Sequence, residues 1–171
     1  VELWKNIEPK QVYRTDIGSI GTNAAKWIRD LSFGSLTKDK LAKSLLDTTP
    51  LWDLVKKIQF QNIDNNISKG LLFALSCSAY SYNDNRTVTF LQTEQETNWD
   101  KPRRYSKKIR MAPEHVMASC AIPILIPSIE VNNEYFGDGG FRNTSPISPI
   151  IHMGARKVLM VGVRGPDEYT D

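Results

Sequence analysis

The residues of this chain best suited to chemistry form the run Gly137-Asp138-Gly139-Gly140. A strand predicted over residues 131–136 leads directly into the run, and functional groups of parallel α/β sheets gather where strands end. Glycines on both sides leave the Asp138 carboxylate uncovered and let a backbone or a substrate come close. Such a carboxylate can be a general base, a metal ligand or an orienting group. A lone Asp-Gly pair, however, is more often a turn that satisfies its own loop.

The other reactive side chains give weaker signals. His115 and His152 fall in predicted helices without a paired spacing, so we expect no catalytic role for either. Cys77 and Cys120 each lie inside an apolar run, and neither belongs to a pair with metal-ligand spacing. We expect both to be buried free thiols, which fits a reducing compartment.

Six basic residues lie within ten positions of a polar stretch, residues 93–110, which we expect to be a loop: Lys101, Arg103, Arg104, Lys107, Lys108 and Arg110. A solvated basic loop is the simpler interpretation. The alternative is contact with an anionic membrane, where each such residue contributes about 1 kcal/mol. The net charge of the chain is only +3, and acidic residues are interleaved with basic ones, so the composition does not indicate nucleic-acid binding.

The hydrophobic pattern changes along the chain. Residues 1–69 are mostly helical in pattern, with apolar side chains every three to four positions. Residues 71–80 and 87–91 are predicted strands, and Asn83-Asp84-Asn85 between them is typical of a turn. These two strands are therefore expected to form a hairpin. Residues 113–121 are predicted to be a short helix with proline in its first turn.

Beyond Asp138 the pattern is typical of a crossover. Pro146 and Pro149 both fall where a helix can begin, and Gly154 is placed to end it. The continuous apolar run 158–163 is typical of a strand that is buried on both faces of a parallel sheet. A strand, a helix and a strand in this order form a right-handed crossover unit. The sequence therefore predicts the α/β class.

Two linked segments carry a resemblance to a known family. The Asp-Gly-Gly run is followed by Asn143, by Pro146 and then by Gly154-Ala155 before an apolar strand. Upstream, Ala118-Ser119-Cys120-Ala121-Ile122-Pro123 has the form Ala-Ser-x-Ala-x-Pro. Both segments, at this spacing, resemble the patatin-like phospholipases.

This resemblance implies a three-layer α/β/α sandwich with a mainly parallel central sheet and a Ser-Asp dyad. Asp138 would be the catalytic aspartate, supported by Gly137, Gly139, Gly140 and Asn143, and no metal or organic cofactor is required. The serine of the family sits in a Gly-x-Ser-x-Gly turn, but no two glycines of the 171 residues are four positions apart. We therefore expect residues 1–171 to be the C-terminal portion of one such domain, with the serine turn and the oxyanion loop upstream of residue 1. Ser119 is expected to be a packing residue, not a substitute nucleophile.

The implied function is that of a lipid acyl hydrolase that acts on phospholipid or other acyl-ester substrates. This chain would supply the aspartate and would be inactive alone. The alternative is a catalytically inactive lipid-surface or protein-interaction module with the same fold, in which the basic stretch would matter more than Asp138. The first residues do not resemble a secretory signal, and no apolar run approaches the roughly 20 residues of a membrane span, so we expect a cytoplasmic or peripheral membrane location.

Overall fold

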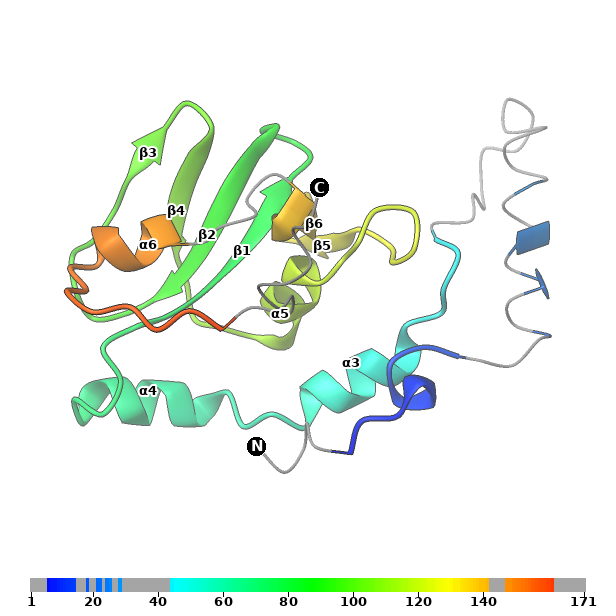
Figure 1. Ribbon diagram of the computed structural model, residues 1–171, viewed down its shortest axis with the longest axis horizontal. Coiled ribbons are helices and arrows are strands. Elements are labelled where there is room, and N and C mark those ends of the chain that lie inside the picture. The colour runs from blue at the N-terminus through cyan, green and yellow to red at the C-terminus, as the bar shows by residue number, and fades with distance from the viewer. Residues whose placement is uncertain are drawn as a thin grey trace, which may run out of the picture.

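The computed structural model describes residues 6–14, 18, 21–22, 24–25, 28, 44–141 and 147–161 (Figure 1). Its centre is a sheet of six strands in the order β3-β4-β2-β1-β6-β5. The strands are β1 (Leu75–Ser81), β2 (Arg86–Gln92), β3 (Asp100–Lys101), β4 (Arg104–Lys108), β5 (Ile129–Val131) and β6 (Glu134–Asp138). The pair β2 and β4 is parallel, and the other neighbouring pairs are antiparallel. The sheet is thus mixed and open, and the predicted α/β class is confirmed.

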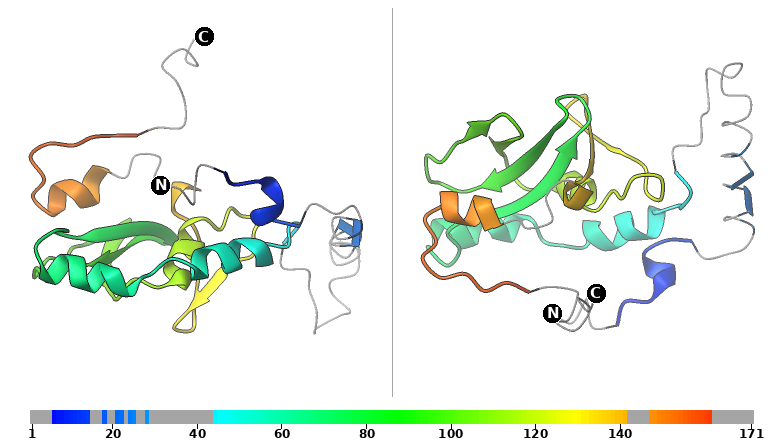
Figure 2. Two further views of the ribbon diagram at one scale, coloured as in Figure 1. Left: turned by 90° about the horizontal axis from the view of Figure 1, so that it is seen from below. Right: turned by 45° about the horizontal axis from the view of Figure 1, so that its top comes forward.

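Helices lie on both faces of this sheet (Figure 2). The helical elements are η1 (Pro9–Gln11), α3 (Thr49–Lys56), α4 (Gln61–Ser68), α5 (Pro113–Ser119), η2 (Gly139–Phe141) and α6 (Ile147–His152). The left view of Figure 2 places α6 over one face and α3 with α5 toward the other. Among the described residues, no helix is long and apolar enough to cross a membrane.

The core lies between the sheet and α5. Val88 and Phe90 of β2 and Phe136 of β6 are almost fully buried, and they belong to one cluster with Met117 and Ala118 of α5. The Phe90 and Phe136 rings pack edge to face at 5.2 Å. Burying a large apolar side chain contributes about 1.5 to 3 kcal/mol, so this cluster fixes α5 and β6 against the central strands.

The predicted hairpin is confirmed as β1 and β2, although β1 begins at Leu75 and not at residue 71. The two strands pair antiparallel, from Leu75 opposite Gln92 to Ser81 opposite Arg86. Asn85 in the turn has a φ of 57°, a left-handed conformation that asparagine tolerates better than most residues. The predicted short helix is also present, as α5.

Two local predictions were wrong because turns and pairing partners were missed. The strand predicted over residues 131–136 is a hairpin of β5 and β6, with Asn132 and Asn133 at positive φ in its turn. Two left-handed residues in a two-residue loop are typical of tight hairpins. The expected loop over residues 93–110 contains β3 and β4, and β4 is ordered by parallel pairing with β2.

The predicted buried strand at 158–163 is not present over its described part. Residues 158–161 form no strand, and Leu159 and Val161 are 91% and 87% exposed. An apolar run becomes a buried strand only where other strands and helices cover it, and no described strand pairs with this one. Residues 162–163 lie outside the described residues.

Candidate active site around Asp138

Asp138 is the last residue of β6, and its backbone is held from two sides. Its Cα lies opposite Ala79 of β1 in the sheet. Its backbone N–H donates a hydrogen bond of 2.8 Å to the carbonyl of Ala121, just after α5. The end of the strand is therefore fixed by α5 as well as by the sheet. Asp138 itself is partly exposed, as a residue that reacts with a substrate must be.

The three glycines around Asp138 differ in their contacts. A Cβ on Gly139 would lie 2.2 Å from the carbonyl oxygen of Ser78, so this position admits no side chain. A Cβ on Gly137 would lie 2.3 Å from the hydroxyl of Tyr82, the far end of a side chain that can swing away. The N–H of Gly140 donates a hydrogen bond of 2.8 Å to Oδ1 of Asp138.

That last contact orients the carboxylate. With Oδ1 engaged by Gly140, the described residues provide no hydrogen bond to Oδ2 of Asp138. One oxygen therefore fixes the orientation of the group, while the other is available to accept a proton. The contact also has the local form of an aspartate turn.

Ser119 holds the site together and is not placed as a nucleophile. Its Oγ donates a hydrogen bond of 2.7 Å to the carbonyl of Ser78 in β1. This is the same carbonyl that Gly139 approaches from the other segment. The packing role predicted for Ser119 agrees with this contact. The sequence could not predict the role of the Ser78 carbonyl, because this is a backbone group that any residue type would provide.

Cys120 lies near Asp138, but its thiol is not activated. The residue is exposed, contrary to the prediction that both cysteines are buried. Partial desolvation of the sulfur, and then the negative charge of Asp138, raise the pKa of Cys120 above its usual value. Cys77 is half-buried with its sulfur 3.7 Å from that of Met111, and desolvation raises its pKa to about 12. Neither thiol is a thiolate at neutral pH.

Both histidines are engaged in packing. His115 is buried, and its Nδ1 accepts a hydrogen bond of 3.1 Å from the backbone N–H of Ala112 at the start of α5. Its ring packs edge to face on Phe90, and burial lowers its pKa. The His152 ring stacks on Trp99 at 5.0 Å. The described part of the chain also contains no group of three His, Cys, Asp or Glu residues that could hold a metal ion.

The comparisons with known proteins decide the family. A family model of patatin-like phospholipases matches residues 8–151, which is well over half of the chain. The chain belongs to the patatin-like phospholipase family. No curated protein and no solved structure matches it. The match includes residues 118–123 and the aspartate loop with Asn143 and Pro146, and it ends before Gly154 and Ala155.

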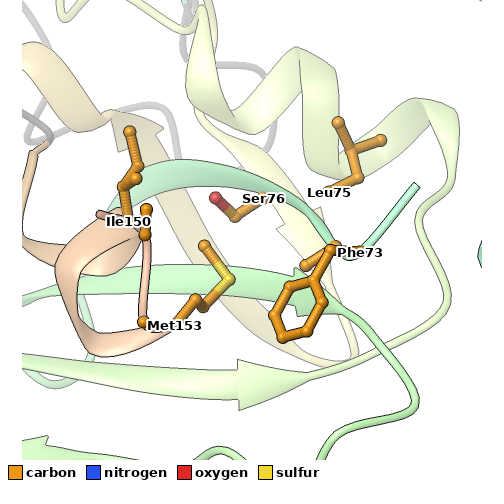
Figure 3. Close-up of a pocket in the computed structure, with 8 residues that line it drawn as sticks. Phe73, Leu75, Ser76, Ile150 and Met153 are labelled. Carbon is orange, nitrogen blue, oxygen red and sulfur yellow. The ribbon is translucent and has the colours of Figure 1, made fainter. Parts of the chain in front are cut away.

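A groove runs along β1 beside the aspartate loop of this patatin-like domain. One pocket of about 380 Å³ is lined by Ser76–Ser78, Ser119, Gly139, Gly140, Pro149 and Ile150. A second pocket of about 420 Å³ is lined by residues 73–76, Ile150 and 153–155. In Figure 3, Ile150 and Met153 face Phe73 and Ser76 across this second pocket. The two pockets share Ser76 and Ile150 in their linings, so they lie next to each other along β1.

The six basic residues of the patatin-like domain fall into two sets of three. Lys107, Lys108 and Arg110 form ion pairs with Glu134, Glu96 and Asp64 respectively. Lys101, Arg103 and Arg104 are exposed at the β3–β4 hairpin, and their side chains form no ion pair with any other described residue. The expected single basic loop is thus a hairpin whose tip alone carries uncompensated positive charge. Asn143 lies outside the described residues.

Proposed function

We propose that this chain supplies the general base of a lipid acyl hydrolase, and that Asp138 is that base. The observation that carries the proposal is the geometry of one carboxylate in a chain of the patatin-like phospholipase family. Asp138 ends a fixed strand, Gly140 engages its Oδ1, and its Oδ2 has no hydrogen-bond donor among the described residues. A groove lies directly beside its loop.

The serine that Asp138 serves belongs to a segment outside these 171 residues. No two glycines of the sequence have the spacing of a Gly-x-Ser-x-Gly turn, and the Ser119 hydroxyl is engaged with Ser78. We therefore propose that residues 1–171 form the C-terminal portion of one domain, whose serine and oxyanion loop precede residue 1. By itself the chain would show no specific hydrolysis, since removing even one oxyanion donor typically costs about 10² to 10³ in rate.

The proposed reaction proceeds in two balanced halves. The serine Oγ attacks the ester carbonyl while its proton passes to Oδ2 of Asp138. The tetrahedral intermediate then expels the alcohol, which takes up that proton, and an acyl-serine remains. A water molecule gives a proton to Asp138 and attacks the acyl-serine; the fatty acid then leaves as the serine Oγ takes that proton back from Asp138. No metal ion or organic cofactor takes part.

The remaining exposed charge supports a proposal about location. Lys101, Arg103 and Arg104 form a cationic tip on the β3–β4 hairpin, and such a tip suits weak contact with an anionic lipid surface. We therefore propose a cytoplasmic protein that binds membranes peripherally while it hydrolyses their lipids.

The test is ester hydrolysis by the polypeptide that contains both this chain and the serine. Wild type should hydrolyse a p-nitrophenyl ester and a phospholipid, and Asp138→Asn should lower kcat by at least roughly 10³-fold, since Asn cannot accept the proton. Glu130→Gln, an exposed carboxylate on β5, is the matched control and should keep wild-type activity. A folded wild type that hydrolyses neither substrate would instead favour the inactive lipid-surface or protein-interaction module.

A further inference from the structure

The loop between α5 and β5 exposes aliphatic side chains to solvent. Ile122, Ile124 and Leu125, which we name the aliphatic loop, are 45%, 57% and 40% exposed. Ile126 beside them packs against the core, so the loop is anchored from within. Figure 1 shows this stretch in yellow, extending past β5 away from the middle of the sheet. Single exposed aliphatic residues are ordinary, but a cluster of them marks an interaction site.

Ile124 also has a strained backbone. Its φ of 74° lies in the left-handed region, where a β-branched residue is a genuine outlier. Glycine or asparagine would adopt the same turn at a lower cost. An isoleucine here combines backbone strain with an exposed apolar side chain, and neither stabilises the described fold. Such strain gathers at functional sites and indicates a role for this side chain beyond folding.

Neighbouring segments hold the loop in place. The N–H groups of Leu45 and Leu46, in the cyan segment before α3 of Figure 1, donate hydrogen bonds of 2.9 Å each to the carbonyls of Ile124 and Leu125. The N–H of Ile126 donates another of 2.9 Å to the carbonyl of the first aliphatic residue. All three carbonyls of the aliphatic loop are thus engaged within the chain. What the loop offers to a partner is therefore its hydrocarbon side chains.

The loop belongs to a stretch of sequence without charge. No Asp, Glu, Lys or Arg occurs between Glu114 and Glu130. A charged side chain is costly to transfer into hydrocarbon, whereas aliphatic side chains favour that transfer. The aliphatic loop can therefore enter an apolar medium without burying a charge. The cationic tip of the β3–β4 hairpin has the opposite chemistry and suits only the charged surface of a membrane.

The aliphatic loop adjoins the proposed base. The carbonyl of Ala121 accepts the 2.8 Å hydrogen bond from the N–H of Asp138, and Ile122 is the next residue along the chain. The chain belongs to a family of phospholipases, and phospholipids carry hydrocarbon chains. A lipid aggregate presented to Asp138 therefore comes within reach of the loop. A hydrocarbon partner fits both the side chains of the loop and the substrate of the site.

We propose that the aliphatic loop inserts into the hydrocarbon of a lipid aggregate and holds the domain on the surface that supplies its substrate. The lipid nature of this partner rests on the proposed function. The contact differs from that of the cationic tip, because hydrophobic insertion persists on neutral lipid and at high salt. The tip requires anionic lipid and low salt. The loop therefore binds the aggregated lipid itself, and the tip responds to its charge.

Flotation with neutral phosphatidylcholine vesicles in about 1 M salt isolates the hydrophobic contact, since charges are then screened beyond roughly 3 Å. The polypeptide that contains the serine carries Asp138→Asn, so the vesicles stay intact. Ile124→Asn with Leu125→Gln should weaken binding by roughly 10- to 100-fold. The matched control Ile151→Asn, at a 61% exposed aliphatic residue of α6, should not. Undiminished binding of the loop variant, or an equal loss in the control, would overturn the proposal.

The choice of asparagine separates lost binding from lost folding. Asparagine tolerates the φ of residue 124 better than isoleucine does, so Ile124→Asn should unfold at the same or a higher urea concentration than its parent. Weaker vesicle binding together with that midpoint supports insertion. A lower midpoint would show that the Ile124 side chain stabilises the fold, and would overturn its assignment to a lipid surface.

Photo-crosslinking identifies the occupant. Benzoylphenylalanine in place of Leu125 should crosslink to the acyl chains of vesicles and, without lipid, to no other part of the polypeptide. A lipid-free crosslink to the segment before residue 1, or to a second copy of the chain, would show that protein covers the loop and would overturn the proposal.

Hydrolysis of a dissolved p-nitrophenyl ester by wild type tests the proposed function separately. Loop-dependent vesicle binding by a protein that hydrolyses no ester would retain the insertion and refute the hydrolysis. Ester hydrolysis by a protein whose loop variant binds neutral vesicles as well as its parent would do the reverse.

Discussion

A side chain at Gly139 would clash with a backbone carbonyl, whereas one at Gly137 would clash with the end of a side chain. This contrast allows a quantitative test of the site. In Gly139→Ala, the new Cβ would lie 2.2 Å from the carbonyl oxygen of Ser78 and 2.5 Å from its carbon. The closest contacts that real Cβ atoms show are about 3.0 Å, so the two backbones must separate by roughly 0.8 Å. Ser78 cannot yield easily, because it belongs to a central strand and its carbonyl also accepts the Ser119 hydrogen bond.

The cost follows from these contacts. Overpacking of a well-ordered site typically costs about 1 to 3 kcal/mol. Loss of the Ser119 hydrogen bond adds about 1 kcal/mol. We therefore expect Gly139→Ala to lower the free energy of unfolding by about 2 to 4 kcal/mol. That is a large fraction of the roughly 5 to 15 kcal/mol of a typical domain.

Gly137→Ala is the matched control. Its Cβ would also be too close to a neighbour, at 2.3 Å, but the neighbour is the hydroxyl end of the half-exposed Tyr82 side chain. Rotation of that ring into solvent relieves the conflict, so we expect a loss below about 1 kcal/mol. Urea denaturation of both variants in the polypeptide that contains the serine provides the comparison. Equal midpoints for the two variants would refute the reasoning from the Ser78 carbonyl.

Three further predictions concern the surroundings of the site. Ser119→Ala should lower the free energy of unfolding, measured by urea denaturation, by about 1 kcal/mol, because it removes one hydrogen bond. The variant should still allow a fluorophosphonate probe to label the nucleophilic serine, since the Ser119 hydroxyl serves packing; a folded variant that is no longer labelled would contradict this. Burial lowers the pKa of His115, so the unfolded state takes up the proton first and stability should fall as pH decreases below about 6.5. His115→Gln should flatten this dependence in urea midpoints measured between pH 7.5 and about 5, and an unchanged slope would exclude His115 as its source. Replacing the hairpin-tip residues Lys101, Arg103 and Arg104 by Gln should weaken binding to vesicles with anionic lipid by roughly 100-fold at low salt. The control replaces three other exposed residues, Lys56, Lys57 and Lys69, and should not weaken binding in this way. Equal effects of the two sets would show that the hairpin tip is not a specific contact.

Local patterns predicted the elements whose order depends on neighbours in sequence. The β1–β2 hairpin has alternating strands and an Asn-rich turn within a few residues, and α5 has its proline at the expected first turn. The position of Asp138 at the end of a strand was predicted for the same reason. In contrast, β4 is ordered by parallel pairing with β2, and no local pattern encodes a pairing between segments separated by a loop.

The remaining predictions were wrong because these features depend on tertiary surroundings that the sequence pattern does not show. The run 158–161 has the composition of a buried strand, but composition does not provide the strands that would bury it. Cys120 lies in an apolar run, yet it follows directly after α5 and is exposed. The division of the basic residues into paired and unpaired sets depends on acidic partners such as Glu134, which lies far along the sequence from Lys107.

The two segments that carry the family resemblance contact each other and the same backbone carbonyl, which gives a physical reason why both are present. Ser119 donates its hydroxyl to the Ser78 carbonyl, and Gly139 packs its bare Cα against that same carbonyl. Two residues further along the first segment, the Ala121 carbonyl accepts the N–H of Asp138. The Ala-Ser-x-Ala segment therefore fixes both the position of Asp138 along β1 and its distance from that strand.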